Sequence, residues 1–74
     1  MDFKKATDTL FSQVGHADLA NALNVSVALI RQARLQSEAS AHRSAPEGWE
    51  RAVRKLAEDR VRRYQRLAEQ LKRP

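Results

Sequence analysis

The chain has 74 residues, of which 42% are hydrophobic and 31% charged, so the composition fits one small soluble domain and argues against a disordered chain. It contains no cysteine, which excludes disulfides and thiolate metal sites, and it has neither a membrane-length apolar run nor a signal-peptide pattern, so we expect a cytoplasmic location. The net charge is +5, and because residues 37–74 hold ten bases against six acids, a polyanionic partner is favoured.

A first helix is predicted over residues 2–14. Asp2 precedes the periodic segment and is a good N-cap, and Gly15 follows it as a residue that can take the left-handed conformation at a helix end. The apolar residues recur at helical spacing and should face a core: Phe3, Ala6, Leu10 and Val14, with Phe11 beside them.

Residues 16–35 predict two short helices joined by a tight turn. The small Ala20 stands where the two backbones must approach. Asn24 occupies the turn position that needs a left-handed backbone, and Ser26 is a good N-cap for the second helix. The residues expected to face the core are Leu19, Leu23, Val25, Ile30 and Ala33.

This segment, HADLANALNVSVALIRQARL, resembles the helix-turn-helix of Cro and phage-repressor DNA-binding proteins, and the resemblance covers 20 of the 74 residues. It implies that the second helix lies in the major groove of DNA with its first residues at the base edges. The residues expected to read bases are Ser26, Val27, Ala28, Arg31 and Gln32. The alternative is a plain three-helix bundle with no nucleic-acid role.

A further set of side chains is expected to contact DNA phosphates: His16, Arg34, Arg43, Arg51 and Lys55. His16 opens the helix whose N-terminus attracts phosphate, although a cap or an exposed ring is an equal alternative. Arg43 lies in the segment 36–46, which is rich in Ser and Ala and reads as a mobile linker. For Arg51 and Lys55 the alternative is a solvated helix face.

A long amphipathic helix is predicted over residues 47–72. Pro46 and Glu47 suit its first turn, Lys72, Arg73 and Pro74 suit its end, and Gly48 should weaken its start only slightly. Its length of about 37 Å exceeds what the preceding helices can cover. Trp49, Val53 and Leu56 should therefore pack within the chain. The distal residues should pair with a second copy: Val61, Tyr64, Leu67, Ala68 and Leu71.

We therefore expect an all-α protein with a compact three-helix helix-turn-helix core and a long C-terminal helix. No catalytic or metal-binding constellation can be assembled from two separate histidines and no cysteine, so we expect neither an enzyme nor a cofactor. The predicted function is a transcriptional regulator, either a repressor or an activator, that binds double-stranded DNA at an inverted repeat as a homodimer with two reading heads about 34 Å apart.

Two alternatives stay open. One is an excisionase-like architectural DNA-binding factor. The other is a protein-interaction module, such as an antiactivator or antitoxin, whose long helix binds a protein partner. The stretch PEGWERAVRKLAEDR, residues 46–60, is similar to the tails of small bacterial helix-turn-helix regulators of mobile elements.

Overall fold

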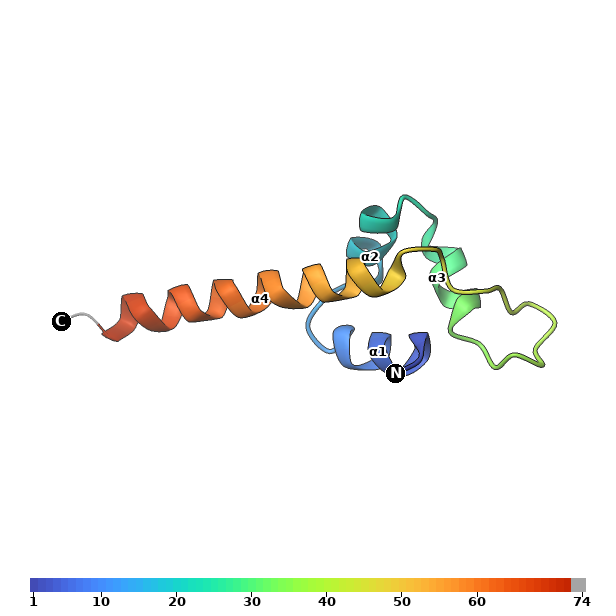
Figure 1. Ribbon diagram of the computed structural model, residues 1–74, viewed down its shortest axis with the longest axis horizontal. Helices are drawn as coiled ribbons and strands as arrows, with labels where there is room; N and C mark the ends of the chain where they lie inside the picture. Colours follow the sequence, from blue (N-terminus) through green and yellow to red (C-terminus); the bar gives the residue numbers. More distant parts are fainter. Residues whose placement is uncertain (73–74) are drawn as a thin grey trace.

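The computed structural model describes residues 1–72 and forms four helices there: α1 (Phe3–Leu10), α2 (His16–Leu23), α3 (Val27–Ala33) and α4 (Trp49–Lys72). Figure 1 shows α1 to α3 gathered at one end of α4, whose other half extends away, so that the molecule measures 57 × 20 × 16 Å. The described residues contain no strand, and the expected all-α class is confirmed. None of the helices in residues 1–72 has the length and apolar character needed to cross a membrane. Arg73 and Pro74, expected to close α4, lie outside the described residues.

Helix α1 begins as predicted but ends earlier. The Asp2 carboxylate accepts a hydrogen bond from the Lys5 backbone N–H at 2.8 Å, which confirms the N-cap. The predicted end at Val14 was wrong, because the regular helix stops at Leu10. After Leu10 the chain forms tight turns in which a backbone N–H donates to the carbonyl three residues earlier, as Ser12 does to Thr9. The Ser12 hydroxyl also donates to the Thr9 carbonyl, at 2.8 Å. Val14 is buried all the same.

The turn between α2 and α3 has the predicted chemistry. Asn24 adopts the left-handed conformation with φ 56° and ψ 45°. Its N–H donates to the Asn21 carbonyl at 3.2 Å, and the Val25 N–H donates to the Ala20 carbonyl at 2.9 Å, which together satisfy the end of α2 as a Schellman motif. The Ser26 hydroxyl then accepts from the Leu29 N–H at 3.1 Å and caps α3.

The core joins all four helices. Leu19 and Ile30 are completely buried at its centre, as predicted. Thr7 is also completely buried, which the apolar pattern did not indicate, and its hydroxyl is satisfied by donating to the Phe3 carbonyl at 2.7 Å. Trp49 closes the core from α4 by meeting the Phe3 ring edge to face, with centroids 5.3 Å apart. The buried apolar residues are Phe3, Ala6, Leu10, Val14, Leu19, Ala20, Ile30 and Ala33.

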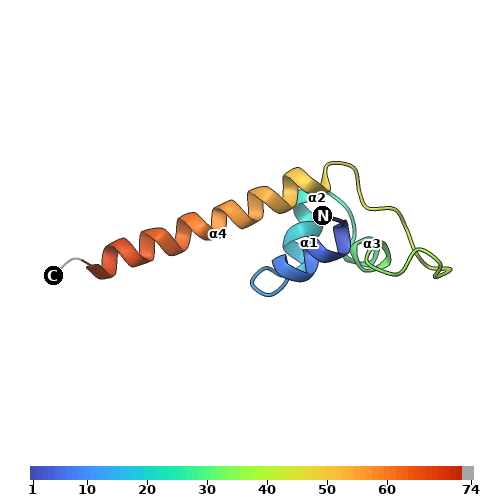
Figure 2. The same cartoon turned by 60° about the horizontal axis from the view of Figure 1, so that its bottom comes forward.

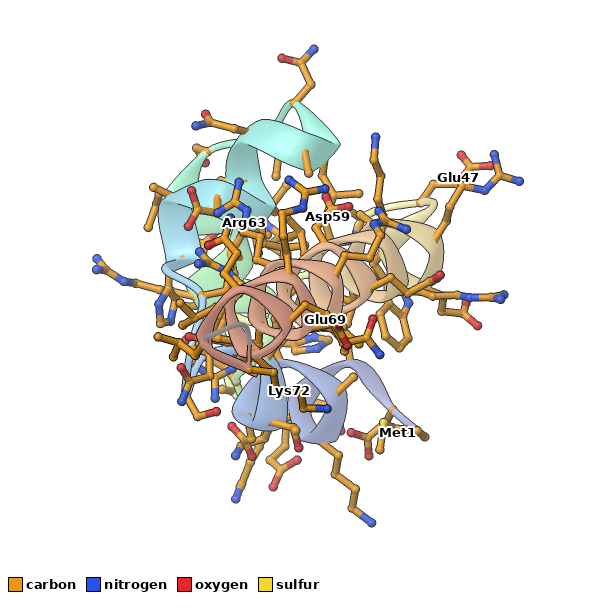
Figure 3. The ribbon with its side chains drawn as sticks, turned by 90° about the vertical axis from the view of Figure 1, so that its left-hand side faces the viewer. Met1, Glu47, Asp59, Arg63, Glu69 and Lys72 are labelled. Atoms are coloured by element: carbon orange, nitrogen blue, oxygen red, sulfur yellow. The ribbon has the colours of Figure 1, made fainter. Side chains whose placement is uncertain are left out.

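Helix α4 begins at Trp49, two residues later than predicted. Gly48 has φ +80°, a left-handed conformation that cannot belong to a right-handed helix and that favours glycine, so this residue sets the start of α4. Figure 3, viewed from the far end of α4, shows α1 and α2 on different sides of it. The apolar residues of its first half pack against the core: Trp49, Ala52, Val53 and Leu56.

The second half of α4 leaves a row of apolar side chains uncovered by the rest of the described chain. We call this row the distal stripe: Val61, Tyr64, Leu67, Ala68 and Leu71. Half or more of the surface of its large members is exposed, rising to 77% for Leu71. The Tyr64 hydroxyl lies 3.4 Å from the Gln13 side-chain oxygen, so the three-helix body reaches along α4 to this point. The expectation that one chain cannot cover all of α4 is confirmed.

Candidate nucleic-acid interface

The outer face of α3 presents a small residue and a basic residue side by side. Ile30 and Ala33 are buried and anchor the opposite face of the helix in the core. Ala28 and Arg31 are exposed and, three residues apart, share one side of the helix. No ion pair involves Arg31 within residues 1–72, so its guanidinium is free to donate to a ligand. This face is open and cationic.

The other three residues expected to read bases are placed differently. Val27 is half-buried and packs against the core, so it does not lie fully outward as predicted. Gln32 is also half-buried, and its carbonyl accepts the Arg43 N–H at 3.3 Å. Ser26 is exposed, but its hydroxyl is occupied as the cap of α3. Ala28 and Arg31 are therefore the exposed members of the predicted set whose side chains have no hydrogen-bond or ion-pair partner within residues 1–72.

Arg34, expected to contact phosphate, lies at the centre of a network that ties three helices together. Its guanidinium forms an ion pair with Asp8 of α1, and the Arg34 side chain is 23% exposed. Nη1 of Arg34 lies 3.3 Å from Nε2 of His16 at the start of α2, and the guanidinium carbon lies 5.1 Å from the centre of the Phe11 ring. His16 in turn stacks on Phe11 with ring centres 3.9 Å apart. The structure thus brings His16 and Arg34 together.

The sequence carried no signal for the Asp8–Arg34 ion pair. The two residues are 26 positions apart and lie on different helices, so no helical spacing relates them. Asp8 also accepts a hydrogen bond from Lys4 at 3.1 Å one turn away. That hydrogen bond, with the charge of Arg34 acting in the same direction, lowers the pKa of the Asp8 carboxyl below its usual value.

The same network favours the neutral form of His16. A guanidinium can only donate, so Nε2 of His16 must accept the hydrogen bond from Arg34, which a protonated ring cannot do. Partial burial, followed by the positive charges of Arg34 and Arg31, lowers the pKa of His16 below its usual value. Protonation of His16 is therefore easier in the unfolded chain than in the folded one.

This difference predicts a loss of stability in mild acid. Because the unfolded chain binds the His16 proton more readily, the free energy of unfolding should fall as the pH drops through the unfolded-state pKa of about 6.5. We expect the melting temperature to decrease between about pH 7.5 and pH 5.5 and the decrease to be smaller in His16→Gln. Thermal denaturation followed by circular dichroism measures both slopes. Identical slopes in the two proteins would exclude His16 as the cause.

The segment 36–46 contains no helix and returns along the end of α3. The Arg43 N–H reaches the carbonyl of Gln32, and Ala45 packs against the core. The guanidinium of Arg43 is exposed and donates to the His42 carbonyl at 3.0 Å. Arg43, expected to contact phosphate, is thus held beside the C-terminal end of α3 by the backbone of this segment.

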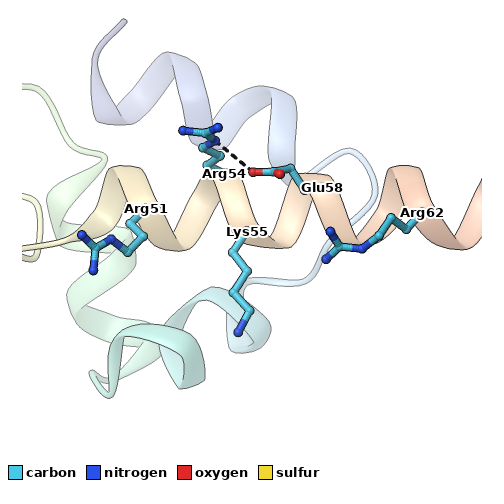
Figure 4. A pocket seen from close by; sticks show the side chains of 5 residues that line it. All are labelled: Arg51, Arg54, Lys55, Glu58 and Arg62. Carbon is cyan, nitrogen blue, oxygen red and sulfur yellow. Dashed lines mark hydrogen bonds and ion pairs between the residues drawn. The ribbon is translucent and has the colours of Figure 1, made fainter.

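A second cationic surface lies on the outer face of the first half of α4. Figure 4 shows its side chains around a shallow hollow of about 290 Å³, lined by Arg51, Arg54, Lys55, Glu58 and Arg62. Arg54 is paired with Glu58 at 2.9 Å, and Arg62 is paired with Asp59. Arg51 and Lys55 form no ion pair within residues 1–72, and they also line a groove beside Ala22 and Leu23 at the end of α2. These two are the cations that the sequence assigned to phosphate.

Side chains that could bind a metal do not gather within residues 1–72, where no three His, Asp or Glu residues lie together. A scan against protein-family models found no match, and searches of curated proteins and of solved structures found no similar protein. The assignment of a function therefore depends on the geometry of α3 and the distribution of charge around it.

Proposed function

We propose that the protein is a transcriptional regulator that binds double-stranded DNA in a sequence-specific manner, with α3 as its reading helix, and that acts as a homodimer. The observation that carries this proposal is the exposed pair of Ala28 and Arg31 on a short helix with a fixed start. Asn24 and Ser26 set that start through the turn and the cap, and Ile30 locks the opposite face into the core. A reading helix needs this combination of rigid placement and an open outer face.

The chemistry of this face suits the edges of base pairs. Arginine binds guanine O6 and N7 with two parallel hydrogen bonds, and Arg31 has no competing ion pair within residues 1–72. The methyl group of Ala28 suits contact with a thymine methyl group, and its small size lets the backbone approach the groove floor. The half-buried Gln32 carries an amide, the group that pairs with adenine N6 and N7.

Cations outside α3 supply attraction that does not depend on sequence. Arg51 and Lys55 lie one turn apart beside the end of α2, and Arg43 lies beside the end of α3. Together with the net charge of +5, they favour association with the phosphate backbone. Binding should therefore weaken steeply as salt is added, which a purely hydrophobic interaction would not do.

The experiment that tests this assignment compares Arg31→Ala with Arg66→Ala, which removes the same charge from the exposed distal part of α4. Loss of a bidentate contact worth about 1 to 3 kcal/mol should weaken binding to a selected duplex about 5- to 150-fold in Arg31→Ala. Binding to a scrambled duplex should weaken far less. Fluorescence anisotropy with both duplexes measures the ratio. Equal losses on the two duplexes would show that Arg31 does not read bases.

A further inference from the structure

The spacing of the distal stripe fits a seam between two helices. Four of its five residues, with Ala57 one turn before them, follow one another at alternating intervals of four and three: Ala57, Val61, Tyr64, Ala68 and Leu71. Leu67, the fifth, lies next to Ala68 at the edge of this series. This alternation is the heptad pattern of paired helices, in which each residue of the seam inserts between residues of a facing helix. All five are exposed, and four of them lie on the second half of α4, so the seam is open to a partner.

Two charges at the edges of the seam favour a second copy in the antiparallel direction. Glu58 and Lys72 lie 14 residues apart, which is two heptads, so they occupy the same edge of the seam near its opposite ends. In an antiparallel pair, Glu58 of each copy, one of whose oxygens accepts from Arg54 of its own helix at 2.9 Å, faces the partner's Lys72, which makes two attractive contacts between the copies. In a parallel pair these residues are two heptads apart and never meet.

The sizes of the side chains favour the same direction. An antiparallel pair centred on residue 66 sets Tyr64 against the partner's Ala68 and Val61 against the partner's Leu71, so that large and small residues alternate across the seam. A parallel pair would set Ala68 against the partner's Ala68 and Tyr64 against the partner's Tyr64. The two alanines would leave a gap in the seam, and the two tyrosines in the next layer would be crowded.

We infer that two copies pair antiparallel through residues 57–72 of α4 and that this pairing sets the two α3 helices about two turns of duplex apart. The inference rests on the proposed function for its DNA spacing, while the pairing itself depends only on α4. Trp49 lies 17 residues before residue 66, the centre of the pair, which is about 25 Å along the helix at about 1.5 Å per residue. The Trp49 residues of the two copies therefore lie about 50 Å apart. Figure 1 shows α3 beyond that end of α4, so the reading helices lie farther apart still.

The sequence predicted reading heads one duplex turn apart, about 34 Å, and the separation derived from the paired helices is larger. The next spacing that returns to the same face of DNA is two turns, about 68 Å. The direction of α3 agrees with such a site. Figure 2 shows α3 nearly end-on while α4 runs along the picture, so α3 crosses the direction of α4. If a duplex lies parallel to the paired α4 helices, α3 therefore crosses the duplex axis, which is the orientation of a recognition helix in the major groove.

The pairing is tested without DNA by a charge-swap cycle on the full chain. Sedimentation should show a dimer for the wild type. Glu58→Lys and Lys72→Glu should each raise the dimer dissociation constant about tenfold, because two attractive contacts become repulsive, and the double swap should restore it. Arg66→Ala, on the outer face, should leave the dimer unchanged. A monomeric wild type at micromolar concentration would overturn the pairing and assign the stripe to a different protein. A double swap no better than either single swap would overturn the antiparallel direction.

The spacing is tested with duplexes that carry two inverted copies of a selected half-site. Centre-to-centre distances of about 10, 16 and 21 base pairs place the half-sites one, one and a half and two turns apart. We expect cooperative binding at two turns and independent binding at one turn. Cooperative binding at one turn alone would contradict the inference while leaving the proposed function intact. Failure to bind any duplex, with the dimer and its charge-swap cycle intact, would contradict the proposed function and leave the pairing intact.

Discussion

Ala28→Glu is expected to abolish specific DNA binding while leaving the fold unchanged. Ala28 is exposed on α3, and a longer side chain there projects into solvent rather than into the core. In a complex, the new carboxylate would hold α3 away from the base edges and would face the phosphates without a partner. Loss of close approach and burial of an unpaired charge should together weaken binding by at least about 3 kcal/mol, or more than 100-fold.

The matched control is Gln70→Glu, which makes the same change in net charge on the exposed distal part of α4. Anisotropy titrations of the two variants against the same selected duplex give the comparison, and circular dichroism checks that both are folded. Gln70→Glu should show only the small general loss that one negative charge causes. If Ala28→Glu binds as tightly as Gln70→Glu, α3 does not enter the groove.

Ile30→Ala is expected to have the largest effect on stability. Ile30 is completely buried between the helices, and removing its side chain leaves a cavity that its neighbours cannot fill without moving. Such a substitution costs about 2 to 5 kcal/mol, and the core of a chain this short supplies only about 3 to 5 kcal/mol. We therefore expect Ile30→Ala to be largely unfolded at physiological temperature.

Leu29→Ala is the control for Ile30→Ala, because it removes a similar volume from the neighbouring, half-buried position. Urea denaturation followed by circular dichroism, at one fixed protein concentration, gives the free energies of unfolding of both variants. The loss for Leu29→Ala should be clearly smaller. Equal losses would mean that Ile30 is not the centre of the core.

Much of the fold could be predicted because it depends on local chemistry. Helical spacing identified the buried Leu19 and Ile30, and short-range hydrogen-bonding preferences identified the caps at Asp2 and Ser26. The left-handed Asn24 followed from the residue's tolerance of that conformation. The exposure of the distal stripe could be predicted from the length of α4 alone, because α4 extends beyond the helices that cover its first half.

The rest depends on contacts between residues far apart in sequence or on competition within a turn. The role of Arg34 is set by Asp8 on another helix, and α1 ends early where turns with side-chain hydrogen bonds replace its last regular turn. The start of α4 was misplaced because Gly48 was treated as a weak helix residue, whereas its positive φ makes it the boundary. Val27 is half-buried because it packs against the core at the start of α3, a contact between helices that the spacing within α3 did not indicate.

The most direct test of DNA recognition by α3 is a selection of duplexes from a random-sequence pool by the full chain, followed by a salt titration of the best sequence. We expect the pool to converge on a defined half-site and the affinity to fall steeply with salt, with a slope that reflects several phosphate contacts. Arg31→Ala should lose its preference for the selected sequence, because Arg31 is assigned to bases. Its affinity should still depend on salt almost as steeply as that of the wild type, because the phosphate contacts remain. A pool that does not converge, or an affinity that does not change with salt, would contradict the account.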